Sequence, residues 1–170
     1  VMKKNFVRMM FGRMVCENLT KLELNAELSY GNDFVLFLIT HFPSLDTLRL
    51  SRGVSSMKNQ DFVNICNGFK NLHSLEFHFV HHESEVEMRS LQRNSTITQL
   101  TLGMTKEVTI EDLKIIASRL KNLQSVSIVS YNISRPSPEY LKEITKIFPR
   151  IVQFMKTGQK NCLKNNFCVT

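Results

Sequence analysis

The chain has little of what marks several classes of catalytic and membrane protein. Its 170 residues include 6 glycines, 4 prolines, 4 cysteines and no tryptophan. The few glycines form no phosphate-binding loop, and no serine or cysteine lies in the sequence context of a nucleophile elbow. No apolar run reaches the roughly 18–20 residues needed to span a bilayer. These absences predict a protein that is not an enzyme, uses no cofactor and has no membrane span.

The cysteines are too few to indicate a disulfide framework. Cys66 falls on the apolar face of a helix expected at residues 61–69, where a free thiol packs as a small hydrophobe. Cys162 and Cys168 are expected to be free thiols, with a bridge or a metal site as lesser alternatives. The first residues lack the apolar core of a secretory signal, and a start on Val suggests a fragment. We therefore expect an intracellular protein, cytoplasmic or nuclear.

The formal net charge of +7 is concentrated at the two ends of the chain. Residues 1–16 carry +4 and residues 142–170 carry +5, so the segment between them carries −2. A surface that binds nucleic acid requires a contiguous basic stripe, which this middle segment does not offer. The charge distribution does not favour nucleic acid as the partner. It leaves open a nucleic-acid or acidic-membrane binder that uses the basic ends.

One short motif, with apolar residues at its first, fourth and sixth positions, recurs along the chain. The copies are separated by 26, 27, 25, 26 and 28 residues. A constant period between about 20 and 50 residues is typical of repeat proteins. The copies begin at Leu19, Leu45, Leu72, Ile97, Leu123 and, in degraded form, Ile151.

A helical pattern separates successive copies of the motif, most clearly in residues 97–128. A strand is expected at Ile97–Leu102, and Thr109, with an acid three residues later, is expected to cap a helix. Apolar residues then recur three or four apart as far as Leu120, and the motif returns at residues 123–128. Each copy therefore predicts a strand. Helices are expected at residues 2–16, 33–42, 61–69 and 137–148, with a weak one near 86–91.

This pattern resembles the leucine-rich repeat family over nearly the whole chain, in copies such as LTKLEL, LDTLRL and LHSLEF. The resemblance implies an α/β solenoid, a short curved arc with parallel strands on its concave side and α-helices on its convex side. The repeat domain is expected at residues 1–156, with five to six repeats and the first one truncated. Residues 157–170 are expected to form an irregular tail or cap.

The family usually places Asn or Cys three positions after the sixth motif residue, where it ties the backbone of the turn. This chain departs from that pattern, so regular turns after the strands are not expected. The residues at these positions are Glu27, Gly53, Val80, Thr105 and Tyr131.

A period near 26 with an amphipathic helix is similar to the cysteine-containing and ribonuclease-inhibitor-like subclasses, and most like the repeat region of F-box/leucine-rich-repeat proteins. That resemblance implies a non-catalytic scaffold, the substrate-recognition region of a ubiquitin-ligase receptor, with an adaptor bound through a segment upstream. The alternative is an inhibitory or sensing module like those of ribonuclease-inhibitor-like proteins or intracellular immune receptors. An upstream F-box would indicate the first, and an upstream nucleotide-binding loop the second.

The outward-facing strand residues are expected to bind a protein or peptide target on the concave face. They carry small polar groups and a few charges, but none of the large aromatic side chains that dominate many interfaces. A solvated sheet face that binds nothing is an equal alternative. The expected contact residues are Lys21, Glu23, Thr47, Arg49, Ser74, Glu76, His78, Gln99, Thr101, Ser125 and Ser127.

The densest group of candidate metal ligands consists of His78, His81, His82 and Glu83. A metal site requires fixed ligand spacing on a rigid element, with a second shell behind it. Adjacent histidines in a loop meet this requirement poorly. We expect them to contact a partner or solvent, and we expect no metal.

Overall fold

The computed structural model describes residues 15–24, 33–50, 57–79, 88–104, 109–130, 137–149, 152–156, 161–163 and 167–169, the last three segments by their backbone. The helices are α2 (Asp33–His41), α3 (Asn59–Gly68), α5 (Ile110–Arg119) and α6 (Pro138–Ile147). The main strands are β1 (Lys21–Leu24), β2 (Thr47–Leu50), β3 (Ser74–Phe79), β4 (Gln99–Met104), β5 (Ser125–Ser130) and β6 (Val152–Lys156).

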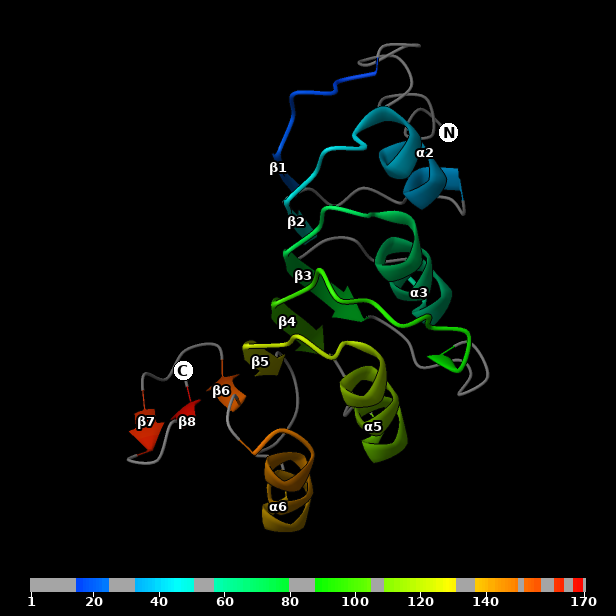
Figure 1. Cartoon of the computed structure of the whole chain (residues 1–170). Coiled ribbons are helices and arrows are strands. Elements are labelled where there is room, and N and C mark those ends of the chain that lie inside the picture. Colours follow the sequence, from blue (N-terminus) through cyan, green and yellow to red (C-terminus); the bar gives the residue numbers. More distant parts are fainter. Residues whose placement is uncertain are drawn as a thin grey trace, which may run out of the picture.

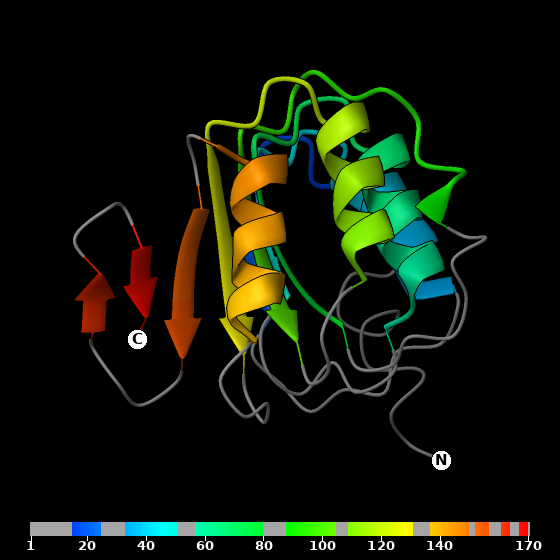
Figure 2. The same ribbon diagram turned by 90° about the horizontal axis from the view of Figure 1, so that it is seen from below.

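The main strands form one parallel sheet in chain order, from β1 to β6. Figure 1 shows the strands following one another down the molecule, with the four helices along one side. In Figure 2 the sheet and the helices form two layers. The predicted α/β class with parallel strands is therefore confirmed.

The inward-facing side chains of neighbouring strands stand in register and pack against the helices. The fourth motif residues form one column and the sixth motif residues a second. From β2 to β5 their exposure is no more than 1%. The first column is Leu22, Leu48, Leu75, Leu100 and Val126, and the second is Leu24, Leu50, Phe77, Leu102 and Ile128. In β6 the backbone register pairs Val152 with Val126 and Phe154 with Ile128. The last copy of the motif was therefore predicted two residues too late, at Ile151.

Strands β1 to β5 begin two residues later than the motif predicts, because the first apolar residue belongs to the preceding turn. In one such turn the Leu45 amide donates to the Phe42 carbonyl at 3.2 Å. The next two amides, of Asp46 and Thr47, both donate to the Thr20 carbonyl, at 2.8 and 2.9 Å. Leu45 is nevertheless fully buried. The motif predicted the burial of its first residue correctly, but it placed the start of the strand too early.

Two of the helices begin where the sequence predicted. The Thr109 hydroxyl accepts a hydrogen bond from the Asp112 amide at 3.1 Å, and the Ser137 hydroxyl accepts one from Tyr140 at 3.1 Å. Such bonds satisfy amides that the first turn leaves without a helical partner. Helix α3 instead begins at Asn59, earlier than expected, and its first-turn carboxylate, of Asp61, accepts the Lys58 amide at 2.8 Å.

Several expectations fall on segments outside the described residues. They include the N-terminal helix up to residue 14, the part of the weak helix within residues 80–87, and the five turn positions after the strands. Within the expected tail, β7 (Asn161–Leu163) and β8 (Phe167–Val169) form an antiparallel pair. In the part of the chain that is described, no helix combines the length and the apolar character needed to cross a bilayer.

Candidate functional site

The sheet face that points away from the helices, here called the open face, carries all eleven predicted contact residues. Strand register places the first outward positions side by side, in the order Lys21, Thr47, Ser74, Gln99 and Ser125. The second outward positions form a parallel row of Glu23, Arg49, Glu76, Thr101 and Ser127. Residues that are about 26 positions apart in the sequence therefore form one continuous surface.

Across β1 to β3 the open face carries a line of alternating charges. The Lys21 ammonium lies 3.0 Å from the Glu23 carboxylate, and the Arg49 guanidinium lies 2.9 Å from the same Oε1 atom. Arg49 also approaches Glu76 at 3.9 Å, and Glu76 lies 3.2 Å from Nε2 of His78. These five side chains hold one another in place across three strands.

The neighbouring cations also affect the titration of Glu23. The hydrogen bond from Lys21, together with the charges of Lys21 and Arg49, holds the pKa of the Glu23 carboxyl below its usual value. The carboxylate therefore stays charged as the pH falls toward the range in which a free glutamate takes up a proton. A partner that meets this end of the face meets an ionised Glu23 already engaged with two cations.

The half of the open face on β4 and β5 differs, because its outward residues are uncharged and, apart from Gln99, small. Gln99 is exposed, and Thr101 and Ser125 are half-exposed. Ser127, at 7% exposure, is almost covered. This half offers hydroxyl and amide groups on a low surface, where a partner backbone can approach closely.

His78 does not stand out from the face, because its ring lies over the neighbouring strand. An ideal Cβ atom built on Gly103 would lie 2.6 Å from Cγ and from Cδ2 of the His78 ring. His78 is 7% exposed as a result. Only glycine at position 103 leaves room for the imidazole. Strand register pairs His78 with Gly103, but nothing in the sequence indicated that the ring is covered.

Of the histidine cluster, His78 alone lies within the described residues. His81, His82 and Glu83 lie outside the described residues. Among the residues that are described, no three His, Cys, Asp or Glu side chains gather in a way that would hold a metal ion. Cys16 and Cys66 are free thiols, and the backbone register of β7 and β8 sets Cys162 opposite Cys168.

Comparison with known proteins finds no matching family model and no matching curated sequence. The geometry of the open face is then the guide to function. It combines a fixed line of charge on β1 to β3 with a low, uncharged surface on β4 and β5. Such a face can orient an extended or folded protein segment through hydrogen bonds and a few charges.

Proposed function

We propose that the chain is a leucine-rich repeat solenoid, a short arc with its open face concave, and that it works as a non-catalytic scaffold for protein binding. The strand register supports this most strongly, because β1 to β5 each match the next strand at the same motif position. In repeat proteins each unit buries its apolar residues against its neighbours, and the stack presents one long binding surface.

Within that class, we propose the substrate-recognition region of an F-box-type ubiquitin-ligase receptor. The support is the resemblance of the 25–28-residue period, with a helix in each unit, to the repeat regions of such receptors. The mechanism would be proximity: the scaffold holds a target where a separate enzyme can modify it. A ribonuclease-inhibitor-like or immune-receptor module would use the same face and is the alternative.

The two halves of the open face would contribute differently to binding. The charges on β1 to β3 already pair with one another, so partner charges there would mainly fix orientation rather than add much affinity. The low half on β4 and β5 lacks large side chains of its own. The target would have to supply the bulky anchor residues on which affinity usually depends.

Site-specific photo-crosslinking tests whether the open face binds a protein. A photoreactive amino acid at Gln99, on β4, is compared with the same residue at Ser118, an exposed position on α5. We expect a discrete protein adduct from position 99 and none from position 118. Equal labelling from both positions, or labelling from position 118 alone, would contradict a binding role for the open face.

The receptor assignment needs a separate experiment on the natural full-length protein. We expect this protein to co-purify with the adaptor that docks F-boxes, and the target crosslinked at position 99 to accumulate when the receptor is depleted. An adaptor that fails to bind would remove the receptor assignment and leave the scaffold proposal intact. A nucleotide-binding domain upstream would favour the immune-receptor alternative.

A further inference from the structure

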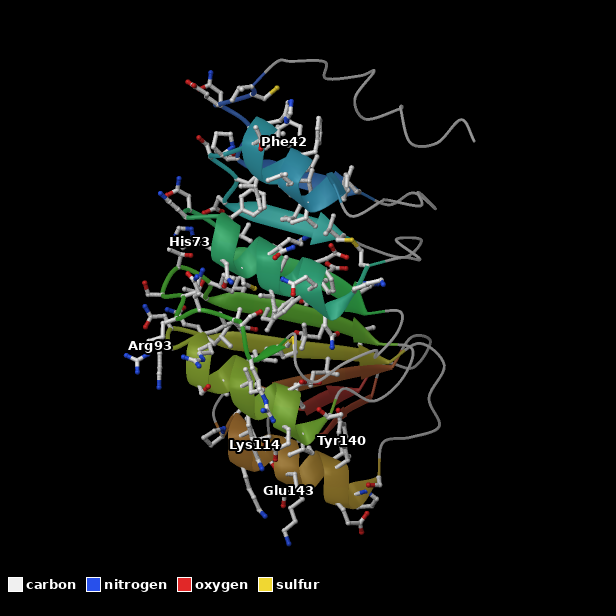
Figure 3. The ribbon with its side chains drawn as sticks, turned by 90° about the vertical axis from the view of Figure 1, so that its right-hand side faces the viewer. Phe42, His73, Arg93, Lys114, Tyr140 and Glu143 are labelled. Atoms are coloured by element: carbon white, nitrogen blue, oxygen red, sulfur yellow. The ribbon has the colours of Figure 1, made fainter. Side chains whose placement is uncertain are left out.

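We infer that a second interaction surface lies at the end of the sheet where the strands begin, and that it binds an acidic segment of a protein partner. It consists of residues 69–73, 88–98 and 119–124, which lead into β3, β4 and β5, and we call it the strand-start rim. Parallel strands begin on the same side of a sheet, so these segments lie together. Figure 3 shows His73 and Arg93 on this side, away from Tyr140.

The strand-start rim carries five cations and no carboxylate side chain. Four of the cations are exposed and Arg119 is half-exposed. None of the five forms an ion pair with another described residue. Next to the rim, Asp46 is engaged by His73, with its carboxylate 2.6 Å from Nδ1 of the ring. The five cations are Lys70, Arg89, Arg93, Arg119 and Lys121.

The helices account for part of this charge, but not all of it. Acids occupy the first turns of α3, α5 and α6, and cations occupy the last turns of α5 and α6, as the helix dipole favours. The C-terminal ends of α3 and α5 bring about half a negative charge each to the rim. Against five cations, about one negative charge leaves a large positive excess. The near-neutral middle of the chain is therefore polarised in the folded protein.

Hydrogen bonds between the segments hold the strand-start rim in one shape. The Asn94 side chain donates to the Cys66 carbonyl at 2.8 Å and accepts from the amides of Thr96 and Ile97 at 2.9 and 3.0 Å. The Asn122 side chain donates to the Ser95 carbonyl at 2.9 Å. The backbone amide of Asn94 reaches the Arg119 carbonyl at 3.0 Å. A rim fixed in this way loses little conformational entropy when a partner binds.

The chemistry of the rim favours carboxylates on an extended protein segment. Guanidinium groups such as those of Arg89 and Arg93 bind carboxylates through paired hydrogen bonds. Exposed amide side chains, including Gln92 and Gln124, can bond to a partner backbone between the charges. The described rim has no exposed Phe or Tyr on which bases could stack, and it consists of loops and the end of one helix, with no element that would enter a duplex groove.

Fluorescence anisotropy with a short labelled peptide of alternating Glu and Ser tests this surface. The rim variant K70Q/R93Q/K121Q is compared with K58Q/K114Q/K142Q, which removes the same amount of charge from a lysine just before α3 and from the first five residues of α5 and α6. We expect the rim variant to bind the peptide about tenfold more weakly, the effect of three exposed ion pairs. The control variant should change Kd less than about twofold, because its lysines lie away from the rim. Circular dichroism confirms that each variant folds.

Three results would overturn the inference. Equal weakening in both variants would mean that net charge alone attracts the peptide. Tighter binding to a short duplex DNA than to the acidic peptide would make the rim a nucleic-acid surface. Binding that appears only when Glu83, Glu85 and Glu87 are replaced by Gln would identify the chain's own acidic segment as the occupant. The rim lies apart from the open face, so none of these results bears on the proposed scaffold function.

Discussion

The same sequence motif has different surroundings in the first strand and in the middle of the sheet. On β1, Leu22 and Leu24 are only half-buried, whereas their partners Leu48 and Leu50 on β2 are fully buried. Strand β2 has a strand on each side, and β1 has only one among the described residues. The motif sets the direction in which a side chain points, and the neighbouring units decide whether it is removed from water.

The two free thiols among the described side chains should show this difference most strongly. Cys16, before β1, is half-exposed, and Cys66 in α3 is buried. In a variant carrying C162S and C168S, we expect Cys16 to react readily with a thiol reagent. Cys66 should react only through opening of the fold, on the order of a thousandfold more slowly. Similar rates for both thiols would show that the middle of the stack opens as easily as its first unit.

Burial also raises the pKa of the Cys66 thiol. The free energy of unfolding should therefore depend on pH. Below the usual thiol pKa of about 8.5, both the folded and the unfolded states hold the proton. Above it, the unfolded thiol ionises while the folded one does not, so the free energy of unfolding should fall as the pH rises. Urea melts at pH 7 and pH 10 measure this fall, which should be smaller in Cys66→Ala.

Truncation of equivalent leucines compares the middle of the sheet with the first strand directly. Leu75→Ala on β3 removes a side chain with 1% exposure, and we expect it to lower the free energy of unfolding by about 2–5 kcal/mol. Leu22→Ala on β1 removes a half-buried side chain and should cost about 1 kcal/mol. Urea unfolding gives both values. Equal losses would mean that β1 is as fully packed as β3.

Gly103 provides a test on the open face of the central strands. Gly103→Ala places a methyl group against the His78 ring, and we expect a loss of about 1–3 kcal/mol from overpacking. Truncating the ring in His78→Ala/Gly103→Ala should recover part of this loss, as measured by thermal unfolding. Gly68→Ala is the control, because its Cβ would first meet the end of the flexible Ile39 side chain. No recovery in the double variant would show that the His78 ring is not the obstacle.

The helix caps should give the smallest effects and extend the comparison to the other end. Thr109→Ala at α5 and Ser137→Ala at α6 each remove one hydrogen bond to the first turn. Each should cost about 1 kcal/mol. The change at α6 should increase local hydrogen exchange in that helix, whereas the change at α5 should lower global stability. The reverse pattern would place the weakest cooperative unit in the middle of the stack.

Local features of the fold were predictable because they depend on residues close together in the chain. Thr109 caps its helix as predicted, and Ser137 caps the helix expected from residue 137, since a cap involves amides within three residues. The starts of β1 to β5 were predicted two residues early, because a strand begins where its backbone first forms hydrogen bonds with the neighbouring strand. That position is set by the shared carbonyls of Thr20 and its equivalents, which accept bonds from the next repeat.

The candidate contact residues were predictable as rows, but their accessibility was not. Alternation along a strand and a constant period suffice to place Thr47 beside Ser74. They do not show that His78 leans over Gly103, or that Ser127 is almost covered. Those facts depend on the shapes of side chains from neighbouring strands, which no local pattern records.

The sequence by itself determined the period, the inward columns of the first five strands, the order of the strands and most of the helix starts, because apolar spacing and capping act over short distances. Only the tertiary structure decided where the charges gather. The middle of the chain has a net charge of −2 from residue 17 to residue 141. In the folded chain, Lys70, Arg93 and Lys121 meet on one rim, because parallel strands bring the starts of successive units to the same end of the sheet.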